Sequence, residues 1–352
     1  MGTFQHLHQP TARLLAIDGQ EFLFFGGTAY LGLLANTDYI ALFKEGIDRY
    51  GLNNGTSRSN NVQLGIYDDV EHYLAERFGF AASAVFSSGY LAAQAAVSAL
   101  TKGKTVFYAP DSHPSLWVSG SPGNDLPFEQ WIAQTVAAIN ESPETEFVLV
   151  SNTLDNLTPK KYDFTPLKNI QPSKKVTLVL DDSHGICIVH KNAISMDAAL
   201  FAQDNMDLLV LASLAKGMGT DAGLVLGSTT SIRQIKSHPI FMGSSPPSPA
   251  SMYALLHGQD IYEKEFNTLH KNISIFRELL PGHLLNSIPH FPVFTSTDSH
   301  LYRHLIRQNI LISSFPYPLP DSPLLNRIVF SALHKREDIE RLCKAINKEA
   351  EI

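Results

Sequence analysis

The sequence predicts an α/β fold, with a large domain built on a mostly parallel central sheet and a small C-terminal α+β domain. Three observations predict it. Short apolar runs alternate with amphipathic stretches, most of these runs show no alternation of polar and apolar residues, and the pattern changes after a proline-rich joint at residues 244–250. Apolar runs without alternation are typical of strands that helices cover on both faces.

Six buried strands and two helices are predicted before the joint. The strands are 84–86, 105–109, 147–151, 176–180, 208–212 and 223–227. The segment 68–78 is predicted to be a helix because apolar residues recur every four positions, two acids begin it and a glycine follows it. A second helix is expected over 91–100, which is rich in alanine, the strongest helix former.

After the joint, a long helix is expected over about 252–280, ending at Pro281 and Gly282. The elements expected after it are a strand at 291–297, a helix at 299–308, a strand at 310–314, a proline-rich loop at 315–323, a strand at 327–332 and a helix at 336–349. We therefore expect three parts: an N-terminal segment at residues 1–40, a large domain at 41–265 and a small domain at 266–352.

The composition excludes several classes of protein. Lys and Arg number 27 against 34 Asp and Glu, a net charge of −7, and no basic run resembles a nucleic-acid or membrane-binding patch. No uncharged apolar stretch reaches the ~18 residues that span a bilayer, and the first residues lack the pattern of a signal peptide. The two cysteines, Cys187 and Cys343, are far apart and lack metal-site spacing. We expect a cytoplasmic protein without nucleic-acid partners, membrane association or bound metal.

Four motifs that could carry chemistry follow predicted strands, where open α/β sheets place their ligands. The first is Ser88-Gly89-Tyr90, in which a strand passes directly into a helix. Backbone N–H groups at a helix start lack partners within the helix and lie at the positive end of its dipole, so they can bind a phosphate. An ordinary serine N-cap is the alternative interpretation.

The second motif contains Asp181, Asp182, Ser183 and His184 after an apolar strand. Partial burial of Asp181 requires a cationic partner or a hydrogen-bond donor, and the protonated nitrogen of a cofactor ring would serve. Metal binding by Asp181 and His184, or a helix cap made by Asp182 or Ser183, would explain the same residues.

The third and fourth motifs contain Lys216 and His113. Lys216 stands among small and apolar residues after a buried strand, where burial lowers the pKa of a lysine toward the nucleophilic range that a Schiff base requires. A lysine that reaches the surface is the alternative. His113 could stack on a planar ring, or could be a surface or capping group.

One cofactor, pyridoxal 5'-phosphate (PLP), requires all four motifs together. It needs a lysine to bind its aldehyde, a carboxylate to keep its pyridine nitrogen protonated, a helix start for its phosphate and a flat group against its ring. The combination, rather than any single motif, therefore predicts PLP.

The motifs in this order resemble those of the α-oxoamine synthase family, a group of fold-type I PLP-dependent transferases that includes the 8-amino-7-oxononanoate synthases. The likeness covers most of the chain. It rests on Tyr30-Leu31-Gly32-Leu33, Gly55-Thr56-Ser57-Arg58, Ser88-Gly89-Tyr90, Asp111-Ser112-His113-Pro114-Ser115, Asp181-Asp182-Ser183-His184-Gly185, Lys216-Gly217, Pro246-Pro247 and Arg327 seven residues before His334.

The resemblance implies a role for each matching residue. Lys216 is implied to bind PLP as a Schiff base and to act as the base, Asp181 to pair with the pyridine nitrogen, and His184 to donate to the ring hydroxyl. His113 would stack on the cofactor ring, and Arg327 would bind the carboxylate of an amino acid. The other positions implied are Ser88, Gly89, Tyr90 and Ser213 for the cofactor, Ser244 and Ser245 for the phosphate of a neighbouring subunit, and Thr28 for the substrate.

The resemblance implies a reaction that joins a small amino acid to an acyl thioester, on coenzyme A or acyl-carrier protein, with loss of carbon dioxide to give an α-aminoketone. It also implies a homodimer with shared active sites. The positions that differ from the family are Thr28-Ala29 for Asn-Asp, Val62-Gln63 for Gly-Thr, Tyr67 for a common histidine, Thr158-Pro159-Lys160-Lys161 for Ser-Met-Asp-Gly, and Phe315 in the loop where oxononanoate synthases carry an arginine for the distal carboxylate. These changes lie mostly around the substrate rather than the cofactor.

Three other functions are considered. An aminotransferase or another amino-acid-modifying PLP enzyme would use the same fold, and transamination would release neither carbon dioxide nor a thiol. A dinucleotide-dependent oxidoreductase is suggested by Gly217, Gly219 and Gly223, although their spacing is GxGxxxG and no ribose-binding acid lies at the usual distance. A non-catalytic protein that keeps the fold is the third, and the intact Lys216, Asp181 and His184 argue against it.

Overall fold

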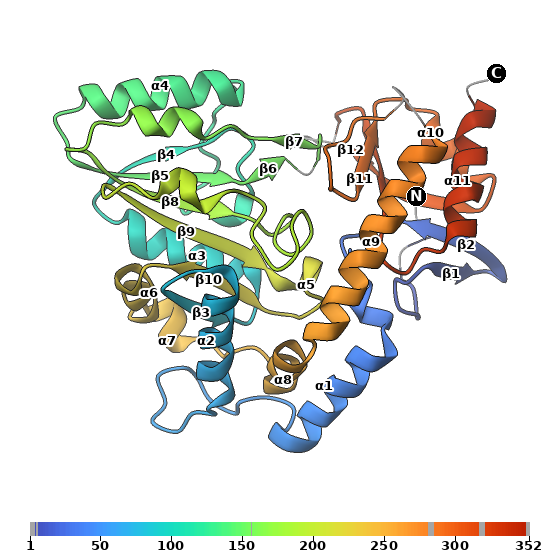
Figure 1. Ribbon diagram of the computed structural model, residues 1–352, viewed down its shortest axis with the longest axis horizontal. Coiled ribbons are helices and arrows are strands. Elements are labelled where there is room, and N and C mark those ends of the chain that lie inside the picture. Colours follow the sequence, from blue (N-terminus) through green and yellow to red (C-terminus); the bar gives the residue numbers. More distant parts are fainter. Residues whose placement is uncertain (1–3, 5, 156, 281–284, 317–320, 350–352) are drawn as a thin grey trace.

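The computed structural model of the protein describes residues 4, 6–155, 157–280, 285–316 and 321–349. Pro281 and Gly282, which were expected to end a helix, lie outside the described residues. The chain forms two principal sheets and a short two-stranded ladder, with helices around them (Figure 1). This architecture confirms the predicted α/β class. In the described part of the chain, no helix is both long enough and apolar enough to cross a membrane.

The larger sheet has six strands in the order β3-β10-β9-β8-β5-β4. Their bounds are β3 (Ala82–Phe86), β4 (Thr105–Tyr108), β5 (Glu146–Asn152), β8 (Lys175–Asp181), β9 (Met206–Ser213) and β10 (Gly223–Gly227). β4, β5, β8 and β9 pair in parallel, whereas β10 is antiparallel to both β3 and β9. All six predicted strands are present, and the sheet is mostly parallel as expected.

Helices cover both faces of this sheet, which explains why its strands show no polar alternation. On β5, Val148 and Val150 belong to an apolar cluster with α3 (Gly89–Thr101) and α6 (Thr229–Lys236). Phe147 and Leu149 belong to another cluster, with α4 (Phe128–Glu141). The helix α2 (Ile66–Phe78) packs against β3 and β10. Alternate residues of one strand therefore enter two different apolar cores.

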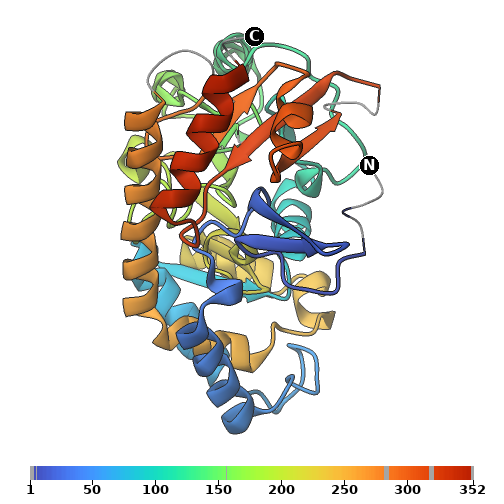
Figure 2. The same cartoon turned by 90° about the vertical axis from the view of Figure 1, so that its right-hand side faces the viewer.

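The smaller sheet is built from both ends of the chain. Its strands, in order, are β1 (Leu14–Ile17), β2 (Gln20–Phe25), β12 (Ile310–Pro316), β13 (Leu324–Val329) and β11 (Val293–Ser296). β2 pairs in parallel with β12, so the N-terminal strands lie beside the C-terminal ones (Figure 2). An ion pair of 2.8 Å between Arg13 and Asp338 adds a second link between the two ends. The sequence did not predict β1 or β2.

Three further helices belong to the C-terminal part: α9 (Gln259–Leu279), α10 (Leu301–Ile306) and α11 (Arg336–Glu349). α9 runs without a break through residues 265 and 266, and the division into parts 1–40, 41–265 and 266–352 remains a prediction. The loop expected from residue 315 begins later, because β12 continues to Pro316. Residues 317–320 of that loop lie outside the described residues.

The prediction of a single long helix over 252–280 is wrong, because the chain forms two helices, α8 (Pro249–His257) and α9, which are separated at Gly258. A side-chain carbon at Gly258 would lie 3.1 Å from the Tyr39 ring and 3.3 Å from the Tyr262 ring. The glycine thus lets two aromatic rings pack against the backbone where the helix changes direction (Figure 1). α8 also packs against α1 (Thr37–Tyr50), which connects the two sheets.

Candidate active site

The carboxyl ends of several strands meet at one edge of the larger sheet. Asp181 is the last residue of β8, and Lys216 lies in α5 (Leu214–Gly217), directly after β9. A small pocket at this edge is lined by His113, Asn152, Thr153, Leu154, Asp181, His184 and Lys216. The structure therefore brings together the lysine, the carboxylate and the two histidines that the sequence singled out.

A hydrogen-bonded chain joins Lys216, His184 and Tyr30. The Nζ atom of Lys216 lies 2.9 Å from Nε2 of His184, and Nδ1 of His184 lies 2.8 Å from the hydroxyl oxygen of Tyr30. Burial lowers the pKa of His184 well below its ordinary value, and the positive charges of Lys216 and Arg327 act in the same direction. A neutral imidazole has one N–H group, so this ring donates to one neighbour and accepts from the other. The chain thereby orients the amine of Lys216.

Burial shifts the pKa values of the two outer groups of this hydrogen-bonded series, Lys216 and Tyr30, in opposite directions. Desolvation lowers the pKa of Lys216; Asp181 opposes this shift and Arg327 adds to it. Desolvation raises the pKa of Tyr30 to about 12, against the lowering effect of Arg327. Lys216 is thus shifted toward its nucleophilic neutral form, while Tyr30 keeps its proton.

His113 stands in the loop after β4, where it lines the pocket while part of the residue stays open to solvent. Its Nδ1 atom accepts a hydrogen bond of 3.2 Å from the backbone N–H of Ser115 and lies 2.7 Å from the hydroxyl of that serine. Its own backbone N–H donates to Oδ1 of Asn152 over 3.1 Å. Partial burial lowers the pKa of His113, although Asp181 raises it. The result is a neutral, fixed ring at the mouth of the pocket.

The two adjacent acids have different environments. Asp181 accepts a hydrogen bond of 2.9 Å from the backbone N–H of Ser183 and lines the pocket. Asp182 is fully buried and accepts from the hydroxyl of Thr153 over 2.7 Å and from both the backbone N–H and the hydroxyl of Ser195. Burial raises the pKa of Asp182 to about 7. Asp182 therefore anchors the turn after β8 and does not cap a helix.

Metal binding was an alternative interpretation of Asp181 and His184. Within the described ranges, no group of three or more His, Cys, Asp or Glu side chains is placed to hold a metal ion. The neighbours of His184 are instead Lys216 and Tyr30.

The start of α3 is held tightly against the ends of β9 and β10. Ser88 caps the helix, since its hydroxyl accepts from the backbone N–H of Leu91 over 3.1 Å. A side-chain carbon at Gly89 would lie 2.5 Å from Cβ of Ser213, whose backbone N–H donates to the hydroxyl of Ser183 over 2.8 Å. These contacts place the first N–H groups of α3 beside the turn that carries Asp181, so the serine cap and the anion site are compatible. The side chain of Tyr90 is 63% exposed.

Gly223→Ala is expected to destabilise the protein by about 1–3 kcal/mol. A side-chain carbon there would lie 2.1 Å from the carbonyl oxygen of Ser88 and 2.8 Å from Cβ of Ala92, so the start of α3 would have to move. Gly65→Ala is the control, because a side-chain carbon at that position, at φ −61°, meets no atom within 4 Å. Denaturant unfolding of both variants measures the difference, and equal midpoints would contradict the packing argument.

Arg327 reaches this region from β13 of the smaller sheet. It is only 6% exposed, and its Nε and Nη2 atoms have no hydrogen-bond partner in the described structure. A buried guanidinium with unpaired N–H groups is costly, and an anionic ligand would satisfy it. The guanidinium lies close enough to Tyr30 to lower the pKa of that hydroxyl. Thr28 lies at the same end of the site, where its carbonyl accepts from the backbone N–H of Tyr30 over 2.9 Å.

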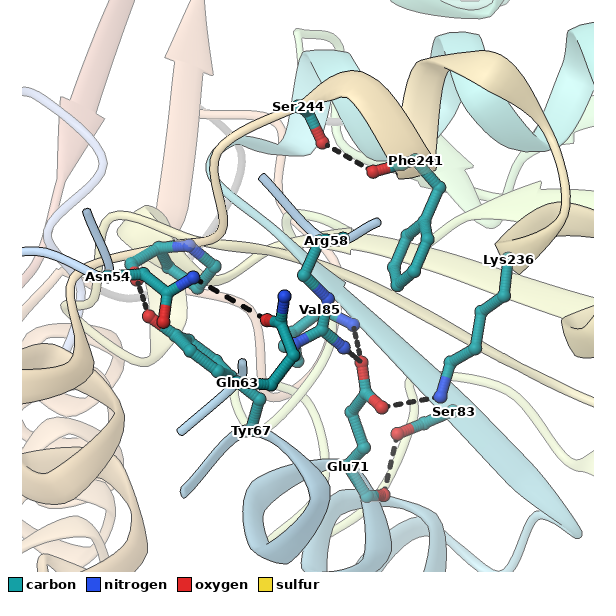
Figure 3. A network of polar contacts seen from close by, with 11 residues as sticks. Asn54, Arg58, Gln63, Tyr67, Glu71, Ser83, Val85, Lys236, Phe241 and Ser244 are labelled. Carbon is teal, nitrogen blue, oxygen red and sulfur yellow. Dashed lines mark hydrogen bonds and ion pairs between the residues drawn. The ribbon is translucent and has the colours of Figure 1, made fainter. Parts of the chain in front are cut away.

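Ser244 and Ser245 lie elsewhere in this chain, at the end of α7 (Pro239–Gly243). The carbonyl of Ser244 accepts from the backbone N–H of Arg58 over 3.3 Å, and its hydroxyl donates to the carbonyl of Phe241 over 3.1 Å. Figure 3 shows the guanidinium of Arg58 beside Phe241 and Glu71. The ion pair between Arg58 and Glu71 measures 2.9 Å. Ser245 is exposed. Their contact with the phosphate of a neighbouring subunit stays a prediction.

Several residues of the site were not singled out as site residues. Asn152 and Thr153 follow the apolar strand β5, and a polar pair at the end of a buried strand is a signal that the sequence does contain. Tyr30 and Ser195 do not follow a predicted strand, so they lack this signal. Tyr30 reaches the site by contacting His184, and Ser195 by contacting Asp182, and both partners are distant in the sequence.

Comparison with known proteins adds a family and two kinds of relative. The family model for aminotransferase class I and II matches residues 25–346. The 8-amino-7-oxononanoate synthase of Aliivibrio fischeri is 25% identical over 95% of this chain and 90% of its own length. That of Pectobacterium atrosepticum is 26% identical over 93% of this chain and 88% of its own length.

The fold is similar to that of a single-substitution variant of serine palmitoyltransferase from S. paucimobilis, solved with a bound PLP–myriocin aldimine. The TM-score is 0.81 at 17% identity, covering 98% of this chain and 93% of that one. With the curated relatives, this similarity confirms the predicted resemblance to the α-oxoamine synthases and the fold-type I architecture.

Proposed function

The chain belongs to the aminotransferase class I and II family, and we propose that this PLP-dependent transferase condenses a small amino acid with an acyl thioester. The observation that carries the proposal is one pocket in which Lys216, Asp181 and His184 meet, near a buried arginine with unpaired N–H groups. The names of the curated relatives support the same class of reaction.

The residues of the pocket fit PLP. Lys216 would hold the cofactor covalently, Asp181 would pair with its ring nitrogen, and His113 would cover one face of its ring. The first N–H groups of α3, with Ser213 packed against Gly89, would bind the phosphate. When bound, PLP supplies an electron sink that stabilises negative charge at the α-carbon of an amino acid.

The side chains then divide the work on the amino acid. Arg327 binds and orients its carboxylate through two N–H groups, and Lys216, with its lowered pKa, takes the α-proton. The α-carbon forms a bond to the acyl carbonyl carbon, and the C–S bond breaks to release the thiol. The carboxylate leaves as carbon dioxide and a proton returns to the α-carbon, which gives an α-aminoketone.

Arg327→Lys is expected to weaken amino-acid binding by about 10–100-fold, because lysine keeps the charge but cannot form the paired hydrogen bonds of the planar fork. Spectral titration of the holoenzyme with glycine, alanine and serine measures the apparent Kd. Arg277→Lys, on α9 and donating to the carbonyl of Ile288, is the control and should bind like wild type. An unchanged Kd for Arg327→Lys would refute the assigned role.

We also propose a cytoplasmic homodimer with shared active sites. Leu52, two residues after α1, and Val62, in the loop that carries Arg58, are 71% and 69% exposed, and contact with a second copy would bury them. Both cysteines, Cys187 and Cys343, are free and buried, which fits a reducing compartment. Sedimentation of the purified holoenzyme tests the dimer, and a monomer with full turnover would refute shared sites.

The decisive experiment supplies amino acid and acyl thioester together and measures thiol and carbon dioxide release. Condensation releases one thiol and one carbon dioxide for each α-aminoketone formed, so the two should appear in equal amounts. An aminotransferase would instead transfer the amino group to a keto acid and release neither, and that result would replace the proposed reaction with the alternative on the same fold.

A further inference from the structure

A second cavity, of about 360 Å³, also reaches Lys216. Its lining residues are Ala29, Leu33, Leu34, Phe43, Ala215, Lys216, Gly219, Thr220, Asp221, Ser248 and Ser251. Apart from Lys216, none of them lines the small pocket that holds Asp181 and His184. Its size lies within the range of about 300–1,000 Å³ that is usual for small-molecule sites. Lys216 thus lines both the small pocket and this second cavity, and the lining of the second cavity indicates which ligand it could bind.

Much of the cavity wall is apolar. Leu33 and Leu34 come from the turn before α1, Phe43 from α1 itself, and Ala215 from α5 beside the lysine. The backbone forms part of the wall at Gly219, at φ +59°, where a side-chain carbon would lie 2.6 Å from Leu33. The apolar side chains of the wall therefore come from the turn before α1, from α1 and from α5.

The hydroxyl groups of the wall already have partners in the protein. Thr220 is hydrogen-bonded to the hydroxyl of Tyr39 over 2.5 Å, and that hydroxyl lies 2.8 Å from the hydroxyl of Tyr262. Ser251 donates to the carbonyl of Ser248 over 2.7 Å, and Ser248 donates to the carbonyl of Leu52 over 3.0 Å. A ligand in this cavity would consequently meet apolar side chains together with hydroxyl groups that already have partners in the protein.

The charge of the lining is equally informative. Besides Lys216, Asp221 is the single charged residue among the described lining residues, and its side chain is exposed. Apart from Lys216, which would hold the cofactor, no cationic side chain lines this cavity in the described structure, so an anionic tail would face the carboxylate of Asp221 without an arginine to pair with.

We propose that this cavity receives the acyl chain of the thioester, and that it selects a chain without a terminal carboxylate. The inference rests on the proposed function. An acyl chain without a terminal carboxylate would differ from the substrate of an 8-amino-7-oxononanoate synthase, whose product, an oxononanoate, carries a terminal carboxylate. Phe315, in β12, is not among the described lining residues of this cavity. The selection between charged and uncharged acyl chains is therefore assigned to the residues around Lys216.

The first test compares thiol release from two matched series, hexanoyl-, octanoyl- and decanoyl-CoA and their analogues with a terminal carboxyl group, with the amino acid fixed. The uncharged chains should be favoured by about tenfold or more in kcat/KM, and each methylene that enters the cavity should add up to about fourfold. Equal rates for charged and uncharged chains, or no dependence on length, would overturn the inference.

Two variants locate the effect. Asp221→Lys should reduce the preference for uncharged chains by about tenfold, whereas Asp204→Lys, at the opposite end of β9, makes the same charge change and should leave the preference unaltered. Leu34→Trp, at a half-buried position, should lower kcat/KM for octanoyl-CoA far more than for acetyl-CoA. A Leu34→Trp enzyme that treats both thioesters alike would place the acyl chain elsewhere.

Exchange of the α-proton of the amino acid separates the two levels of failure. Exchange and thiol release without the chain preference would overturn only the acyl cavity. Exchange without thiol release from any thioester would overturn the proposed condensation, and the cavity assignment with it.

Discussion

Lys216→Ala is expected to lose covalently held cofactor and to lower turnover by at least about a thousandfold. The amine of Lys216 is directed by His184 over 2.9 Å, and burial lowers its pKa, so no other amine in the pocket lining can take its place. Alanine keeps α5 intact because it favours a helix. The expected result is a folded protein that no longer turns yellow when PLP is added.

Borohydride reduction followed by peptide mapping provides the direct measurement. Reduction of the wild-type holoenzyme should fix the cofactor on Lys216, and the alanine variant should remain unlabelled. Lys191→Ala, which removes only a surface ion pair with Glu263, is the control and should be labelled like wild type. A label on any other lysine would invalidate the assignment.

Asp181→Asn is expected to lower the rate of α-proton exchange by at least about a hundredfold while PLP still binds. Asparagine can still accept the 2.9 Å hydrogen bond from the backbone N–H of Ser183, so the turn is preserved. What is lost is the negative charge that would keep the cofactor nitrogen protonated. Exchange of deuterium into glycine, followed by NMR, measures the rate, and a rate like that of wild type would contradict this role for Asp181.

Asp182→Asn is the matched control, one residue further along. Burial raises the pKa of Asp182 to about 7 in the folded protein, above the ordinary value of 3.8. Between these values the folded state binds more protons than the unfolded state, so this group's contribution to the free energy of unfolding decreases as the pH rises from about 4 to 7. The asparagine variant should lose that dependence and keep α-proton exchange near the wild-type rate.

The larger sheet could be predicted from the sequence for a physical reason. Its strands, such as β5 with Phe147 and Leu149 on one face and Val148 and Val150 on the other, are apolar throughout because each face enters a core. The smaller sheet could not be predicted from the sequence. Pairing of β2 with β12 joins segments from opposite ends of the chain, and local periodicity carries no information about such a partner.

The site was predictable in its motifs and not in its contacts. Lys216 and Asp181 were found because a charged residue after an apolar strand is unusual, and the order of motifs suggested one cofactor. The hydrogen bond between His184 and Tyr30, and the burial of Asp182 behind Asp181, depend on tertiary packing. Gly258 likewise ended a helix because of two rings that lie far away in the sequence or in the next turn.

The pairing of β2 with β12 also has a consequence for synthesis on the ribosome. Strand β2 leaves the exit tunnel about 290 residues before β12, the strand with which it must pair in parallel, because β2 begins at Gln20 and β12 at Ile310. At translation rates of about 5–20 residues per second, the early strand waits on the order of tens of seconds with its edge unsatisfied. Arg327, in the strand beside β12, is translated later still, so the nascent chain lacks this buried arginine until both strands have been made.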